Sequence, residues 1–140
     1  MDGRAFLHSA QRLLAGASEA DWRTSAGRSY YALLNEVRTT LRRWGFVPPR
    51  RDQIHAWVRL RLIFSKNADL YQIGRTLENL NQIRNQADYQ LEVPGPFVDP
   101  KQARLAIGSS TAAITLLDQI EADPGRRSAA ITAVGATITP

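Results

Sequence analysis

A stripe of apolar residues over residues 22–44 constrains the fold of this chain more than any other feature of its sequence. The members of the stripe lie three or four positions apart and are Trp22, Ala26, Tyr30, Leu33, Val37, Leu41 and Trp44. Residues at this spacing share one face of an α-helix, so the stripe predicts a helix of about 33 Å that is buried along one side.

The same periodicity predicts four further helices, with breaks of glycine, proline or polar residues between them. They cover about residues 2–17, 52–64, 69–91 and 100–122, with Asp52 as the cap of the second of these and Leu91 on the apolar line of the third. The short connections favour antiparallel neighbours. We therefore expect an all-α fold, an antiparallel up-and-down bundle of four to five helices over residues 1–122.

The end of the chain does not continue this pattern. Asp123-Pro124-Gly125 ends the last predicted helix, and residues 126–140 are apolar, β-prone and almost uncharged after Arg127. They have no partner strand in the chain. We therefore expect residues 123–140 to be a C-terminal extension, and two alternatives stay open: a disordered tail, or a segment that docks onto a partner.

Composition narrows the possible chemistry. The 140 residues include no cysteine, which excludes disulfides, cysteine zinc sites and thiol catalysis. There are only two histidines, His8 and His55, and we expect no metal and no cofactor. No apolar stretch is long enough to span a membrane, and the first ten residues lack the apolar core of a secretory signal, which predicts a cytoplasmic protein. The net charge is +5, and 16 of the 18 basic residues are arginine, which favours a polyanionic partner such as RNA or a nucleotide.

Arg84 is the most informative single residue, because it falls on the apolar line of its predicted helix. A guanidinium in that position is costly unless it is paired, and Asp88, four residues later, is placed to pair with it. Asn85 and Tyr89 form a second polar pair on the adjoining face. One interpretation is an ion pair that only fastens the helix to its neighbours; the other is a functional site.

Arg28, Tyr30 and Tyr31 form a second group, on the long helix. Tyr30 belongs to the apolar stripe, so we expect its ring in the core and its hydroxyl bonded to a partner. Arg28 and Tyr31 flank it and are candidate binding residues. Ion pairing of Arg28 with Asp88 is the less favoured role.

Two motifs carry a resemblance to a known family. The stretch Gly27-Arg28-Ser29-Tyr30-Tyr31-Ala32 and the later Ile83-Arg84-Asn85-Gln86-Ala87-Asp88-Tyr89 resemble the HEPN superfamily, in its small prokaryotic branch with Arg-x-Tyr-Tyr-Ala and Arg-Asn-x-x-Asp-Tyr helices. The resemblance covers about residues 5–121 in order and spacing.

The resemblance implies a bundle that is usually a homodimer, with the motifs of two protomers meeting in one composite site. In active members an arginine, a polar residue directly after it, and a histidine that follows the arginine after four to six intervening residues cleave RNA without a metal. Arg84 and Asn85 match, whereas Tyr89 stands in the histidine window. His55 lies on a different predicted helix, so it can take the histidine's role only if the fold brings it near.

Two functional hypotheses follow from the resemblance. The first is a ribonuclease-type toxin or antiviral defence effector with Arg84, Asn85, Asp88 and Tyr89 as catalytic residues. The alternative is a non-catalytic module that binds RNA, a nucleotide or a minimal nucleotidyltransferase. Such partners add nucleotides to a tyrosine near the motif in related systems, which makes Tyr89 the candidate modification site. A structural adaptor that acts through its tail is a third hypothesis.

Overall fold

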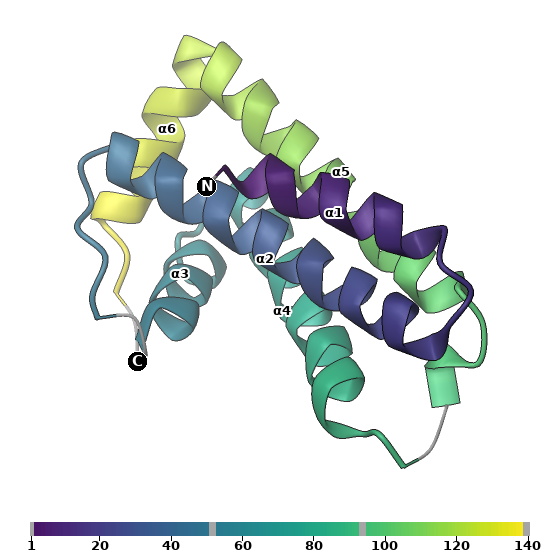
Figure 1. Ribbon diagram of the computed structural model, residues 1–140. Helices are drawn as coiled ribbons and strands as arrows, with labels where there is room; N and C mark the ends of the chain where they lie inside the picture. Colours follow the sequence, from purple (N-terminus) through teal and green to yellow (C-terminus); the bar gives the residue numbers. More distant parts are fainter. Residues whose placement is uncertain (1, 51–52, 93–94, 139–140) are drawn as a thin grey trace.

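The computed structural model describes residues 2–50, 53–92 and 95–138, and this part of the chain is all-helical, without strands. The elements are α1 (Gly3–Leu14), α2 (Glu19–Arg43), α3 (Ile54–Ile63), α4 (Ala68–Tyr89), a 3-10 turn η2 (Gly95–Phe97), α5 (Lys101–Ala122) and α6 (Pro124–Gly135). The expected all-α helical bundle is confirmed. α1 runs antiparallel to α2, and α4 runs antiparallel to α5 (Figure 1).

The long helix α2 is the centre of the bundle, in contact with α1, α3, α4 and α5. Its predicted apolar stripe is the buried side, from Ala26, which is fully buried, to Leu41 and Trp44. Ser18 caps its first turn by accepting a hydrogen bond from the Asp21 amide. Gly45 ends it with a φ of +97°, a backbone conformation that suits glycine.

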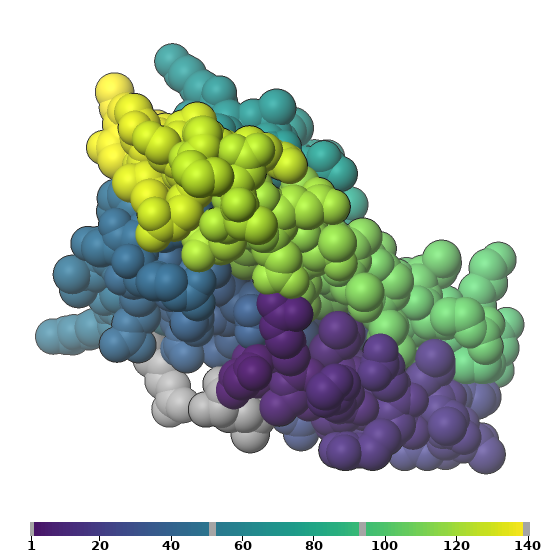
Figure 2. Space-filling view, turned by 90° about the horizontal axis from the view of Figure 1, so that it is seen from above, coloured from purple at the N-terminus to yellow at the C-terminus, as the bar shows by residue number. Residues whose placement is uncertain are grey.

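α1 and α5 lie side by side along one face of the molecule, as Figure 2 shows. On the opposite side of α2, α3 and α4 diverge from the short connection between Ile63 and Ala68 and leave their far ends apart (Figure 1). The start of α3 and the end of α4 are therefore on the same side of α2.

One expectation from the sequence is corrected by the structure, and another concerns a residue that the structure does not describe. Leu91 does not extend the buried line of α4, because the helix ends at Tyr89 and Leu91 is 64% exposed. The expected helix cap at Asp52 falls outside the described residues.

Of the two alternatives for the C-terminal extension, the disordered tail is wrong for residues 124–135, which form α6. Asp123 caps this helix, with Oδ1 accepting from the amides of Gly125 and Arg126. Ala130 and Val134 are buried in the core, and Arg126 pairs with Asp69 of α4 at 3.1 Å. Burial of one face and a good cap therefore outweigh the β-propensity of the segment. Docking onto a partner stays a prediction.

None of the described helices combines the length and the apolar character that crossing a membrane requires.

Candidate functional site

Arg84 lies at the point where α4 faces α2, and its guanidinium is bonded on several sides. It donates to Tyr31 Oη of α2 at 3.2 Å, to Asn85 Oδ1 at 3.0 Å, and to Asn81 Oδ1 at 3.3 and 3.2 Å. The predicted ion pair with Asp88 is present, with 3.7 Å between Nη1 and Oδ2. Arg84 is 16% exposed and Asp88 44% exposed. The guanidinium is therefore held in place at the edge of the core, and its acidic partner reaches solvent.

Two tyrosine rings of α2 form the surface under this guanidinium. The guanidinium carbon of Arg84 lies 5.2 Å from the ring centre of Tyr30 and 5.7 Å from that of Tyr31. A cation over an aromatic face is attracted by the ring, so the tyrosines fix Arg84 without neutralising its charge. Tyr30 is 1% exposed, and burial raises the pKa of its phenol to about 12, so the phenol stays protonated at neutral pH.

His55, at the start of α3, joins this group through contacts with both tyrosine rings. Its ring stacks on the Tyr30 ring with centroids 5.6 Å apart, and its Nδ1 shares a hydrogen bond with Tyr30 Oη. Burial lowers the pKa of the imidazole, and the positive charge of Arg84 lowers it further. His55 is therefore neutral at neutral pH. We call Arg84, Tyr30, Tyr31 and His55 the Arg84–His55 cluster.

A neutral imidazole has one nitrogen that donates and one that accepts a hydrogen bond. When Nδ1 carries the hydrogen and donates it to Tyr30 Oη, Nε2 has a free lone pair and can take a proton. When Tyr30 donates instead, Nε2 carries the hydrogen and acts as a hydrogen-bond donor. The cluster thus combines a fixed positive charge with an imidazole that is neutral at pH 7 and can accept a proton.

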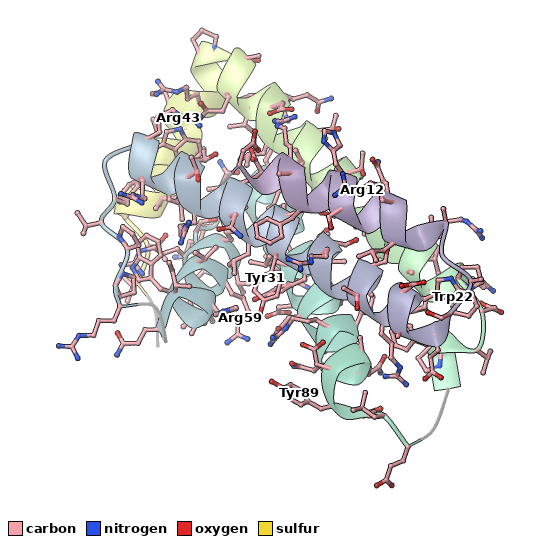
Figure 3. All side chains as sticks on the ribbon, viewed as in Figure 1. Arg12, Trp22, Tyr31, Arg43, Arg59 and Tyr89 are labelled. Atoms are coloured by element: carbon pink, nitrogen blue, oxygen red, sulfur yellow. The ribbon has the colours of Figure 1, made fainter. Side chains whose placement is uncertain are left out.

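The structure brings together only some of the predicted site residues. Arg84, Asn85 and Asp88 form one network, and Tyr31 belongs to it through its hydroxyl. Tyr89 does not: it is 74% exposed and lies at the far end of α4, apart from the other labelled residues (Figure 3). The described side chains show no hydrogen bond between Tyr89 and Asn85.

Arg28 also lies apart from Arg84. Its guanidinium carbon is 5.5 Å from the ring centre of Phe6 on α1, and no ion pair joins it to Asp88 among the described contacts. Arg28, Tyr31 and Asp88 nevertheless line one shallow hollow, together with Thr24 and Gly27. A Cβ on Gly27 would lie 3.9 Å from Arg84 Cγ, so this part of α2 passes close to α4.

Three residues of the site region escaped sequence reasoning. Asn81 lies one turn before Arg84, and this spacing is the signal that marks it as a partner. Arg23 is buried, and its guanidinium donates to the carbonyls of Ala87 and Gln90 at the end of α4, at 2.9 Å in both cases. Its four-residue spacing from Glu19 was the available signal. Arg38, described below, carries no such signal.

The charge around the cluster is positive. Arg59 of α3 is close enough to Tyr30 to act on its pKa, and in Figure 3 Arg59 and Tyr31 both lie below α2, between α3 and α4. Within the described ranges no group of three or more acidic or histidine side chains is placed to hold a metal ion. The arrangement is suited to binding an anion and to acid–base chemistry beside it.

Comparisons with protein-family models, with curated proteins and with solved structures find no match to this chain.

Proposed function

We propose that this chain is a HEPN-type protein that cleaves RNA without a metal ion, as a toxin or defence effector. The observation that carries the proposal is that Arg84 and His55 both contact the same two rings, those of Tyr30 and Tyr31. An arginine and a histidine at one site are the two groups that the reaction needs, and here the histidine comes from α3 instead of the motif helix.

In the proposed reaction the RNA 2′-oxygen attacks the adjacent phosphorus, and the bond from phosphorus to the 5′-oxygen of the next nucleotide breaks. The 2′-hydroxyl proton goes to His55, and the leaving 5′-oxygen takes a proton from the His55 imidazolium that forms. The products are a 2′,3′-cyclic phosphate and a 5′-hydroxyl. Arg84 stabilises the negative charge that grows on the phosphate oxygens, and a guanidinium already held by Tyr31 and Asn81 needs little reorganisation to do so.

Asp88 is the group that RNA would displace. At 3.7 Å its carboxylate forms a loose ion pair with Arg84, and its 44% exposure leaves it free to turn toward water. A phosphate is a better bidentate partner for a guanidinium than this carboxylate at its present distance. Asp88 therefore keeps Arg84 paired until an anion arrives.

We extend the proposal to assembly and control. A homodimer would bring two of these sites together, and the exposed Asn85 and Tyr89 are the motif residues that a second chain can reach. Tyr89 would be the acceptor for a minimal nucleotidyltransferase partner, which its 74% exposure supports. A nucleotide added there would place negative charge at the end of α4 and compete with RNA.

A non-catalytic binding module is the second candidate, and one observation favours it. Four side-chain partners already engage Arg84, from Tyr31, Asn81, Asn85 and Asp88, so the guanidinium has a structural role even without substrate. In this candidate the same basic surface binds RNA or the partner protein, and no bond is broken.

The deciding experiment is cleavage of a labelled single-stranded RNA in the presence of EDTA. We expect the wild type to release fragments that end in 2′,3′-cyclic phosphate. Arg84→Ala should slow cleavage by about 100-fold to 1,000-fold, and His55→Ala by at least about 100-fold. Arg75→Ala, on the same helix but exposed, is the matched control and should keep the wild-type rate.

Circular dichroism must first show that each variant is folded, and Arg84→Lys is the variant to use if the alanine variant is not. Absence of cleavage by the wild type over a range of RNAs would overturn the nuclease proposal. Salt-dependent RNA binding by the same preparation would then support the binding module, because each phosphate contact releases counterions.

A further inference from the structure

A second hollow lies beside the Arg84–His55 cluster, between α1, α2 and α3. It has a volume of about 430 Å³, within the size range of small-ligand sites. The polar and aromatic residues that line it are Phe6, Arg28, Tyr31, Asn35, Arg38 and His55. We call it the arginine pocket.

The charge of this pocket is unbalanced. No acidic residue lines it, and within the described part of the chain no carboxylate lies within ion-pair distance of Arg28 or Arg38. The Nε of Arg38 is moreover buried without a hydrogen-bond partner. An unsatisfied buried donor is destabilising, so a ligand that accepts a hydrogen bond there gains this interaction.

The pocket also has an aromatic wall. The rings of Phe6 and Tyr31 lie 6.2 Å apart, and Arg28 packs over Phe6, which holds this guanidinium at the wall. Asn35 donates to the carbonyl of Tyr31 at 2.8 Å, so its amide is fixed. Two arginines and an aromatic wall are the pattern that binds a nucleotide, with charge for the phosphate and a ring for the base.

The position of the pocket relates it to the cluster. Tyr31 and His55 belong to both the pocket and the cluster. The pocket residues of α2 lie three or four positions apart on one line along the helix: Arg28, Tyr31, Asn35 and Arg38. The seven positions from Tyr31, which bonds to Arg84, to Arg38 correspond to about 10 Å along the helix. The two basic groups are therefore neighbours on one surface.

We propose that the arginine pocket binds a phosphate of single-stranded RNA, on the nucleotide next to the one that Arg84 contacts, with Arg38 as its main ligand and the Phe6–Tyr31 wall against the base. This proposal rests on the proposed function for the identity of the ligand. It makes Arg38 a binding residue that does not touch the reacting phosphate.

The test is fluorescence anisotropy with a labelled 2′-O-methyl oligoribonucleotide, which lacks the hydroxyl needed for cleavage. Arg38→Gln should weaken binding about tenfold and reduce the slope of log K against log salt by about 0.7, the value for one phosphate contact on a single strand. Arg38→Lys, which keeps the charge, should restore part of the affinity. Arg42→Gln, one turn further on α2 and exposed, is the matched control and should change affinity by less than about twofold.

Equal affinities of Arg38→Gln and Arg42→Gln would overturn the proposal. Loss of adenosine monophosphate binding in Arg38→Gln, with oligonucleotide binding unchanged, would identify a free nucleotide as the ligand and overturn it too. Failure of the proposed function is distinguishable, because it appears as no cleavage by the wild type, whereas this test measures binding alone.

Discussion

Replacing Arg23 by methionine removes the side chain that ties the end of α4 to α2. The Arg23 guanidinium donates to the carbonyls of Gln86, Ala87 and Gln90 at 3.0, 2.9 and 2.9 Å, and its carbon lies 4.9 Å from the ring centre of Phe97. The last carbonyls of a helix have no partner within the helix, so Arg23 satisfies the carbonyls of Ala87 and Gln90, and it adds a second bond to the Gln86 carbonyl, which also accepts from the Gln90 amide at 3.1 Å. Methionine keeps most of the buried stem and removes the donors.

The expected cost follows from these three bonds. Hydrogen bonds to charged groups contribute about 1.5–3 kcal/mol each, but water can replace part of this at the exposed Gln90. With about 1 kcal/mol for each carbonyl, the variant loses about 3 kcal/mol of unfolding free energy. A chain of 140 residues has an unfolding entropy of about 0.3 kcal/mol per degree, so Tm should fall by about 10 °C.

Thermal unfolding followed by circular dichroism measures this loss, with Arg42→Met as the control. Arg42 is exposed in the last turn of the same helix, and its replacement should cost no more than about 0.5 kcal/mol. A fall in Tm of less than about 2 °C for Arg23→Met, or an equal fall for Arg42→Met, would refute the assignment of Arg23 as the anchor of α4.

Three further predictions concern packing and the cluster. Gly74→Ala should lower the unfolding free energy by about 1–3 kcal/mol in urea unfolding, because the new Cβ would lie 2.9 Å from Leu62 Cβ. Gly108→Ala is the matched comparison: it has open space around it and should raise the unfolding free energy by about 0.5–1 kcal/mol. The pKa of His55 is lower in the folded than in the unfolded chain, so the folded state binds fewer protons and the unfolding free energy should decline as pH falls below about 6.5. His55→Gln should remove this part of the decline. The same pH profile in the variant and the wild type would contradict the prediction. Tyr30→Phe removes the hydroxyl bonded to His55 Nδ1 and should lower the unfolding free energy by about 1 kcal/mol in urea unfolding. The variant should also shift the titration of the His55 ring in NMR spectra. An unshifted titration would show that the hydroxyl has no influence on the imidazole.

The sequence predicts what depends on local spacing. The α2 stripe, the end of that helix at Gly45 and the Arg84–Asp88 pair all follow from residues within a few turns of one another, and the structure contains each of them. α6 was not predicted, because its helical state depends on the burial of Ala130 and Val134 against the bundle, which residues 126–140 alone do not reveal.

The Arg84–His55 cluster depends more on tertiary structure than these local features do. The stacking of His55 on Tyr30 requires α3 to return to the middle of α2, and periodicity specifies which face of α3 is buried but not where the helix lies. Arg38 resembles any other arginine in the sequence, and only the unpartnered Nε inside the fold distinguishes it. The contacts between helices, not the motif, therefore identify these two residues.

The most direct test of the central claim, that Arg84 and His55 form one site, is a double-mutant cycle on the rate of RNA cleavage in EDTA. Each single alanine variant should lower the rate by at least about 100-fold, and the double variant should be no slower than the slower single variant, because groups that act as a unit are not additive. A fold-reduction of the cleavage rate in the double variant that equals the product of the two single-variant reductions would contradict the claim. A wild-type rate for His55→Ala would also contradict it.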